Sequence, residues 1–287
     1  MNRTTEQRVL EAHRPDGVSR GAFCPSEHLC LDFPSPVLAQ KLEHFEPIGL
    51  AELGPVTLLD RTDTKYVLRQ DQLLEQLPSL CAGYRILEIN SRRLSAYHTL
   101  YFDTTDYALY RQHHSGRRTR YKVRSREYVE TGQSYLEIKR KLGADRTQKE
   151  RLATPQMTTL LTSEALAFVT HRLPWLRSPL APRVWNRFVR VTLVSRERPE
   201  RLTLDFALRF WGDGRCIALP GVVTAEVKYV GRHHASDYIQ VMRQQGIRPT
   251  GFSKYCIGAS LLNAELKYNR FKPHLRLLQK LQQGGSA

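Results

Sequence analysis

The sequence predicts an α+β protein built around a closed β tunnel, with a charged lumen and an apolar outside that is flanked by helices. Two observations predict this fold: strands follow one another through most of the chain, and several of them carry charged residues at every second position. A third observation, a net charge of +16 over 287 residues, indicates a polyanionic partner. The hydrophobic content of 41% is enough for a core.

The strands and helices are predicted in order from hydrophobic periodicity and turn signals. Residues 1–45 form a polar N-terminal arm with room for one short helix. The chain changes character at Val56, and the series dominated by strands indicates the α+β class. Strands are expected at 56–68, 85–90, 94–102, 117–128, 133–141, 183–194, 201–210 and 222–230, and helices at 69–80, 155–173, 233–246 and 253–266.

The segment RTRYKVRSREY, residues 118–128, shows the alternation most clearly. Its cations occupy alternate positions, which a strand places on one face: Arg118, Arg120, Lys122, Arg124 and Arg126. Other strands repeat the pattern with both signs of charge: Arg61, Asp63 and Lys65; Glu137, Lys139 and Lys141; Arg201, Thr203, Asp205 and Arg209; Glu226 and Lys228. The strand at 183–194 is less regular, because Arg183 and Arg187 share one parity and Arg190 has the other.

A single strand of this kind has a simpler explanation, namely an antiparallel strand with one solvated face. That explanation weakens when five or six strands carry Arg, Lys and a few carboxylates rather than Ser, Thr and Asn. A closed barrel with a charged lumen accounts for all of them together. Cations in a narrow lumen are costly unless an anion enters, so the expected occupant is a polyanion.

Other features limit the class of protein. Five scattered cysteines, an odd number, argue against a disulfide framework. No apolar run is long enough to span a membrane and the N-terminus lacks an apolar signal core, so we expect no transmembrane segment and a cytoplasmic location. Nucleic-acid binding is disfavoured, because the charge is spread over many strands rather than gathered at one edge.

Seven motifs in order resemble the catalytic domain of the vacuolar transporter chaperone (VTC) family, from about Phe45 to about Leu266: RTDTKYVL, YFDT, YKVRSREY, YLEIKRK, LTLDFALRF, AEVKY and GFSKY. The resemblance implies a closed antiparallel tunnel of eight strands, within the triphosphate tunnel (CYTH-like) superfamily. It also implies transfer of the ATP γ-phosphate to a growing polyphosphate chain, with Mn²⁺ or Mg²⁺. The expected organisation is an arm at 1–45, the tunnel domain at 46–266, and a basic C-terminal helix and tail at 267–287.

The resemblance assigns roles to residues that match the family's motifs. Catalytic and substrate-binding roles fall on Lys65, Arg124, Arg126, Lys139, Arg187 and Arg201; Lys228 and Lys254 are further substrate-binding residues, and Glu226 is the metal ligand. The expected partners are ATP and polyphosphate, and the resemblance leaves room for a separate membrane protein.

One departure bears on the reaction. The hydrolases and cyclases of the superfamily begin with Glu-x-Glu-x-Lys, where this chain has Arg61, Asp63 and Lys65. The loss of one carboxylate weakens a two-metal hydrolase interpretation. The same cations can serve synthesis and breakdown of polyphosphate, so a triphosphate or polyphosphate hydrolase remains open as an alternative. A polyphosphate-binding protein without catalysis and, less favoured, a nucleic-acid-binding module are the others.

Overall fold

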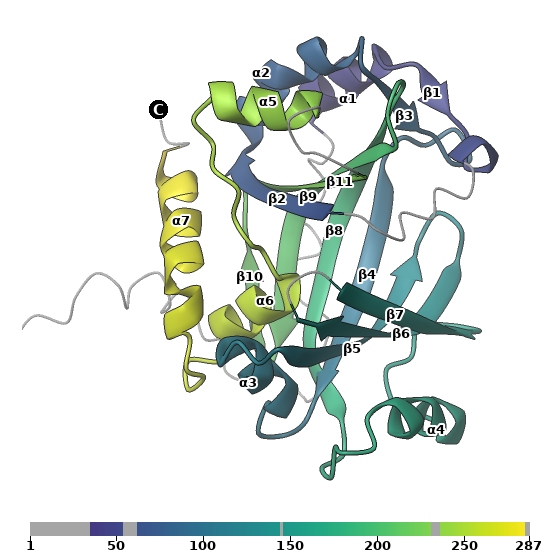
Figure 1. Ribbon diagram of the computed structural model, residues 1–287, viewed down its shortest axis with the longest axis vertical. Coiled ribbons are helices and arrows are strands. Elements are labelled where there is room, and N and C mark those ends of the chain that lie inside the picture. The colour runs from purple at the N-terminus through teal and green to yellow at the C-terminus, as the bar shows by residue number, and fades with distance from the viewer. Residues whose placement is uncertain (1–34, 54–61, 144–145, 231–235, 285–287) are drawn as a thin grey trace, which may run out of the picture.

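A computed structural model describes residues 35–53, 62–143, 146–230 and 236–284, and it confirms the predicted α+β class (Figure 1). The strands are β1 (Pro47–Ile48), β2 (Thr62–Arg69), β3 (Tyr84–Leu87), β4 (Ser95–Asp103), β5 (Thr119–Tyr128), β6 (Gln133–Leu142), β7 (Arg146–Thr154), β8 (Ala181–Ser195), β9 (Glu200–Gly212), β10 (Arg215–Ala218) and β11 (Val222–Tyr229). The α-helices are α1 (Pro36–Glu43), α2 (Gln70–Leu80), α3 (Ala108–His114), α4 (Ser163–Arg172), α5 (Asp237–Gln244), α6 (Lys254–Leu262) and α7 (Lys272–Gln283).

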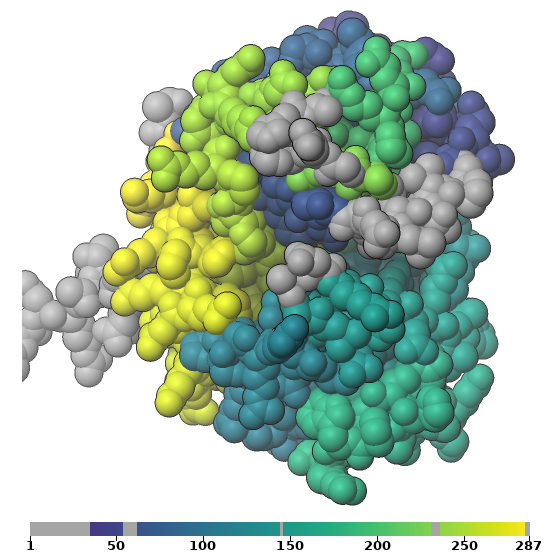
Figure 2. Space-filling view, viewed as in Figure 1, coloured from purple at the N-terminus to yellow at the C-terminus, as the bar shows by residue number. Residues whose placement is uncertain are grey.

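The strands form one curled sheet, with the main order β2-β11-β9-β8-β4-β5-β6-β7. All pairs along this order are antiparallel, and the only parallel pair described is β1 with β3. The prediction of a closed tunnel needs correction: within the described ranges no pairing joins β2 to β7, so the sheet is open between these edges. In Figure 2 the surface of β2 is set back between α5 and the teal strands β5–β7.

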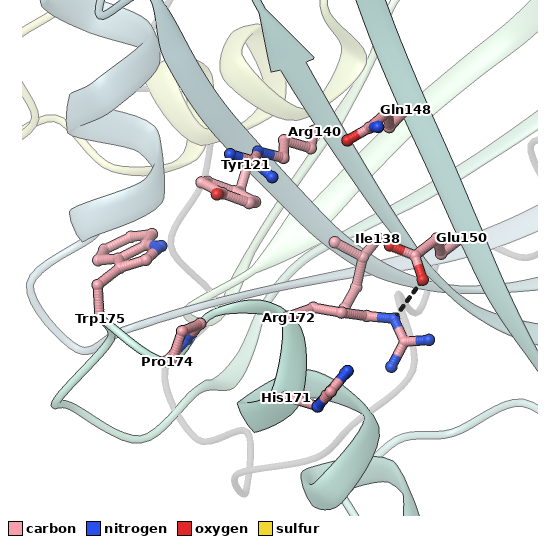
Figure 3. Close-up of a pocket in the computed structure, with 9 residues that line it drawn as sticks. All are labelled: Tyr121, Ile138, Arg140, Gln148, Glu150, His171, Arg172, Pro174 and Trp175. Atoms are coloured by element: carbon pink, nitrogen blue, oxygen red, sulfur yellow. Dashed lines mark hydrogen bonds and ion pairs between the residues drawn. The ribbon is translucent and has the colours of Figure 1, made fainter.

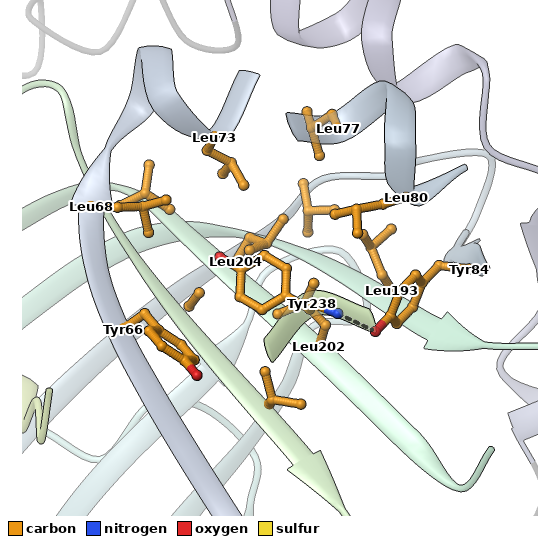
Figure 4. Packing of buried hydrophobic residues seen from close by; sticks show 14 of the residues in the cluster. Tyr66, Leu68, Leu73, Leu77, Leu80, Tyr84, Leu193, Leu202, Leu204 and Tyr238 are labelled. Atoms are coloured by element: carbon orange, nitrogen blue, oxygen red, sulfur yellow. Dashed lines mark hydrogen bonds between the residues drawn. The ribbon is translucent and has the colours of Figure 1, made fainter. Parts of the chain in front are cut away.

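Helices α1, α2 and α5 cover the outer face of one half of the sheet (Figure 1). Leu73 and Leu77 of α2 pack with Leu202 and Leu204 of β9, and all four are fully buried (Figure 4). These leucines have the parity opposite to the charged residues of β9, as the alternation predicted. Leu38 and Leu42 of α1 join the same cluster, so the described end of the predicted N-terminal arm contributes to the core.

Helix α4 covers the outer face of the other half. Ala165 and Val169 of α4 pack against Val123 of β5 and against Leu136 and Ile138 of β6. This helix was predicted at 155–173 and is shorter than expected. It begins at Ser163, because the Thr162 side chain accepts a hydrogen bond from the Ala165 amide and caps the helix there.

Helix α6 lies on the inner face of the sheet (Figure 1). Its buried residues pack against Phe188, Phe210 and other apolar residues of β8 and β9. Gly258 permits this close packing, since a Cβ atom built there would lie 2.6 Å from Cδ1 of Phe210. One end of the inner face is therefore apolar and covered by α6, while charged residues occupy the other end.

Three further results concern the predictions. Strand β7 was not expected, because its sequence RTQKERLAT is polar and its residues are mostly exposed. Cys81 and Cys256 are free thiols, whereas Cys216 is disulfide-bonded, a bond that the sequence did not lead us to expect. No helix in the described part of the chain is both long and apolar enough to cross a membrane.

Candidate functional site

Most of the predicted site residues share the inner face of the sheet, at the end that α6 leaves uncovered. Strand pairing places Glu226 opposite Lys65, Lys228 opposite Arg201, and Lys122 opposite Lys139, and directly opposed residues point to the same face. We call this set the charged face: Asp63, Lys65, Lys122, Arg124, Arg126, Glu137, Lys139, Lys149, Arg190, Arg201, Asp205, Glu226, Lys228 and Lys254. The predicted residues Lys65, Arg124, Arg126, Lys139, Arg201, Glu226, Lys228 and Lys254 all belong to it.

Asp205 lies at the centre of the best-paired part of the charged face. Arg190 donates to it from Nε at 2.5 Å and from Nη2 at 2.8 Å, and Lys254 at the start of α6 also donates to it. The Asp205 side chain is 5% exposed. Burial alone would raise the pKa of this carboxyl, but Arg190 and Lys254 outweigh it and hold the pKa below its ordinary range. Asp205 is therefore a buried counter-charge between two cations.

Glu226 is held in the same way by cations from two strands. Its Oε1 lies 3.3 Å from the Nζ of Lys65, and its Oε2 accepts from Lys228. Burial would raise the pKa of Glu226, but these two lysines hold it well below its ordinary value. Lys65 also donates to the Phe252 carbonyl at 3.3 Å, just before α6, which ties β2 to the segment that caps the charged face.

Glu137 supplies the third carboxylate. It accepts from Arg124 at 2.7 Å and also contacts Lys149 of β7, and its side chain is 1% exposed. Burial would raise its pKa, but Arg124, Arg126 and Lys149 lower it to about 2. Each of these three carboxylates is thus ionised and lies between two cations.

A row of lysines crosses β5, β6 and β7. Lys139 lies directly opposite Lys122 on one side and Lys149 on the other. Like charges placed directly opposite each other destabilise a sheet. Burial first, and then Lys65 and Lys122, lower the pKa of Lys139 to about 7; burial likewise lowers that of Lys122 to about 8. We call Lys122, Lys139 and Lys149 the lysine row.

No carboxylate among the described residues lies within ion-pair distance of Lys139, Lys122 or Arg126. Lys122 donates to the Ser253 hydroxyl at 2.8 Å, and Arg126 donates to Thr99 at 3.1 Å. The Arg126 guanidinium also lies 5.3 Å from the ring centroid of Tyr97. These contacts position the cations but leave their charge uncompensated, which is the arrangement that binds an anion.

Arg187 does not belong to the charged face, contrary to the expectation from the sequence. It is paired with His98, whose Nδ1 lies 3.0 Å from Glu127 on the opposite face of the sheet. Arg190, three residues later, occupies the inward position instead. The parity of Arg190 differs from that of Arg187 in the sequence, but alternation did not show which of the two points inward, because the segment is apolar on both faces. Phe188 packs with α6 on the inner face, and Val191 packs in the cluster with α1, α2 and α5 on the outer face.

The carboxylates of the charged face offer few ligands for a divalent metal ion. Within the described ranges no group of three or more Asp, Glu, His or Cys side chains is placed to hold one. Glu226 and Asp63 are nevertheless diagonal neighbours on the same face of β11 and β2, where such positions lie about 7–8 Å apart. Mg²⁺ is commonly held by one or two carboxylates and completed by substrate phosphates, so this pair fits Mg²⁺ or Mn²⁺ bound together with a phosphate substrate. Glu137 and Asp205 fit less well, because each is enclosed by cations.

Comparison with known proteins gives one family and several distant structures. Residues 60–263 match the VTC domain, and no curated protein matches the chain. A candidate adenylate cyclase from Bacillus halodurans is 14% identical with a TM-score of 0.44, over 74% of this chain and 98% of that one. A candidate adenylyl cyclase from Hippeastrum, described as revealing a dominant triphosphatase activity, has the same identity and TM-score over 70% and 97%.

Proposed function

Because the chain belongs to the VTC domain family, we propose that it transfers the γ-phosphate of ATP to a growing polyphosphate chain on the charged face, with a divalent metal ion. In this reaction a terminal phosphate oxygen of the acceptor forms a bond to the γ-phosphorus, and the bond between that phosphorus and the β–γ bridging oxygen breaks. ADP leaves with the bridging oxygen. Phosphoryl transfer of this kind depends on positioning and charge stabilisation more than on covalent chemistry by the protein.

The observation that carries the proposal is the lysine row. Three amines from adjacent strands lie side by side, and Glu137 is the one carboxylate among the described residues that contacts any of them. This arrangement costs free energy in the ligand-free protein through burial and like-charge repulsion. A chain of phosphates would remove that cost, because its charges repeat along its length as the lysines repeat across the strands.

The other cations then have separable roles. Arg124 and Arg126 are suited to hold equatorial phosphate oxygens, because a guanidinium offers paired donors in a fixed plane. Lys254 and Lys65 lie at the end capped by α6, where they would hold one end of the bound phosphates. Charge-assisted hydrogen bonds of this kind contribute about 1.5–3 kcal/mol each, so a few of them suffice for firm binding.

The metal ion would be held by Glu226, with Asp63 as a second ligand and phosphate oxygens completing the coordination. When bound, it would neutralise charge on the phosphates of the substrate. Lys65 and Lys228 now contact the Glu226 oxygens, and they would turn toward phosphate oxygens as the metal binds. The protein itself supplies the cations that align donor and acceptor phosphates.

The test is to incubate the purified protein with ATP and Mn²⁺ and to measure long-chain polyphosphate, ADP and orthophosphate. We expect polyphosphate and ADP to form together. Lys139→Ala should lower polyphosphate synthesis about a hundredfold, the effect of about two charge-assisted contacts. Arg187→Ala is the matched control, because it removes a cation from the opposite face of the sheet, and it should retain synthesis within about twofold.

Three results would overturn the proposal. Release of orthophosphate without polyphosphate would make the protein a triphosphatase. Equal losses in Lys139→Ala and Arg187→Ala would show that the inner face is not where the reaction occurs. Polyphosphate binding without turnover of ATP, under conditions where the protein is folded, would leave a binding protein and remove the catalytic role.

A further inference from the structure

A pocket of about 440 Å³ lies on the outer face of the sheet, outside the charged face (Figure 3). Strands β5, β6 and β7 form its floor, and the end of α4 with the turn that follows forms its wall. Its floor residues Tyr121, Ile138 and Gln148 are the immediate neighbours in sequence of the lysine row. They therefore point to the opposite face of the sheet, and nothing in the proposed reaction uses them.

Two aromatic side chains line the pocket. The rings of Tyr121 and Trp175 have their centroids 5.5 Å apart, with their planes inclined at 45°. Tyr121 is buried at 6% exposure, whereas Trp175 is 41% exposed. An indole left exposed beside a pocket offers a face on which a flat ring can stack, and stacking of this kind binds nucleobases in many proteins.

The charges in the pocket leave one cation available. Arg172 donates to Glu150 at 2.7 Å, so these two residues neutralise each other. The Arg140 guanidinium lies 5.6 Å from the Tyr121 ring centroid, and no described carboxylate lies within ion-pair distance of it. A guanidinium of this kind, held beside an aromatic ring, is suited to one phosphate group rather than to a long polyanion.

We propose that this pocket binds a purine nucleoside monophosphate, with the base against Trp175 and the phosphate on Arg140. The volume falls in the usual range for small-ligand sites. Gln148 and Glu150 supply amide and carboxylate oxygens that can accept from the exocyclic amino group of a base such as adenine. The combination of a stacking surface with a single uncompensated cation distinguishes this pocket from the charged face, which offers many cations.

The experiment titrates the wild-type protein with AMP in the presence of saturating tripolyphosphate, which occupies the anion sites of the charged face. Binding is measured by calorimetry and by the fluorescence of Trp175. The other two tryptophans, Trp185 and Trp211, stack on each other and do not line the pocket, so they should respond less. We expect AMP to bind and to quench the fluorescence. Trp175→Ala and Arg140→Ala should each weaken AMP binding about tenfold or more, whereas Trp175→Phe, which keeps a stacking ring, should retain most of it.

Lys139→Ala is the matched control from the other face of the same strand, and it should leave the dissociation constant for AMP within about twofold. Melting curves of each variant show that it is folded; Trp175 and Arg140 are surface residues whose replacement should not unfold the chain. Failure of AMP to bind at millimolar concentration would overturn the proposal. So would undiminished binding to Trp175→Ala, or equal binding of inorganic phosphate and AMP, because the base would then make no contribution.

Discussion

Two parts of the charged face differ in how their cations are balanced. On β8, β9, β11 and β2, the carboxylates Asp205 and Glu226 each lie between two cations. On β5, β6 and β7, Glu137 is the one described carboxylate facing inward, and it serves Arg124 and Lys149. We call the first part the paired region and the second, with the lysine row, the unpaired region.

The difference distinguishes cations that stabilise the fold from cations whose charge is available to bind a ligand. In the paired region each ionised carboxylate offsets part of the cost of burying its neighbours, so removal of one partner leaves a buried charge. In the unpaired region the cost of burial is visible in the lowered pKa values of Lys122 and Lys139. Substitutions in the paired region should therefore affect stability first, and those at Lys65, Lys254 and Glu226 should also affect the reaction, because these residues have proposed roles in it. Substitutions in the unpaired region should affect ligand binding.

The largest expected effect is on stability, from Asp205→Asn. This change leaves Arg190 and Lys254 buried without their carboxylate, and we expect the free energy of unfolding to fall by about 3–5 kcal/mol. Urea unfolding measures it. The control is Asp71→Asn, which breaks an exposed ion pair with Arg69 and should cost under about 1 kcal/mol. Similar losses in both variants would contradict the distinction between buried and exposed pairs.

The second effect is on turnover, from Glu226→Gln, which keeps the shape of the side chain and removes its charge. If Glu226 holds the metal ion, loss of the ligand should cost about 3 kcal/mol in the barrier, or a hundredfold or more in rate. The Mn²⁺ concentration for half-maximal rate should also rise. Rates measured against Mn²⁺ concentration, together with a melting curve, test this; an unshifted metal curve with lowered stability would make Glu226 a counter-charge only.

The sequence predicted the inward face of β5 and β6 because alternation in a strand depends only on local backbone geometry. Lys122, Arg124 and Arg126 share a parity that their apolar neighbours Tyr121 and Val123 oppose, and the structure places the two sets on opposite faces. The same rule separated Lys139 from Ile138. Prediction succeeded where one face of the strand is apolar and the other is charged.

Prediction failed where both faces of a strand are covered. Around Arg187 and Arg190, β8 contacts α6 on its inner side and the outer core on the other, so alternation does not show which face is inside. The open edge of the sheet could not be predicted from the sequence either, because pairing between β2 and β7 would depend on contacts between segments that are distant in the chain. Strand β7 has no apolar face that would reveal it.

The third effect is stabilisation by a ligand, which tests the unpaired region directly. Tripolyphosphate at a hundredfold excess over its dissociation constant should raise the free energy of unfolding by about 2.7 kcal/mol. Lys139→Ala should show a smaller gain at the same concentration, and Arg187→Ala should match the wild type. Thermal melting with and without the ligand measures these gains. A folded wild-type protein with no shift would argue strongly against an anion site on the charged face.

The smallest effect concerns pH, and its sign follows from the direction of the pKa shifts. Burial and neighbouring lysines lower the pKa of Lys139 to about 7, and burial lowers that of Lys122 to about 8. In the unfolded chain a lysine keeps its proton to about pH 10.4. Between these values the unfolded state binds more protons, so these two groups make the ligand-free protein more stable as pH rises. A bound polyphosphate favours the charged lysines, so its binding takes up protons over the same range.

Affinity for tripolyphosphate should therefore fall as pH rises from 7 to 9, by at most about tenfold per pH unit for each lysine that must regain a proton. Calorimetry at several pH values measures the slope. Lys139→Arg is the control, because its guanidinium stays charged throughout this range while the titration of the ligand is common to both proteins. The variant should have a slope smaller by up to one proton. Identical slopes in the two proteins would mean that Lys139 is already charged before the ligand binds, and the unpaired region would then lose the feature that distinguishes it.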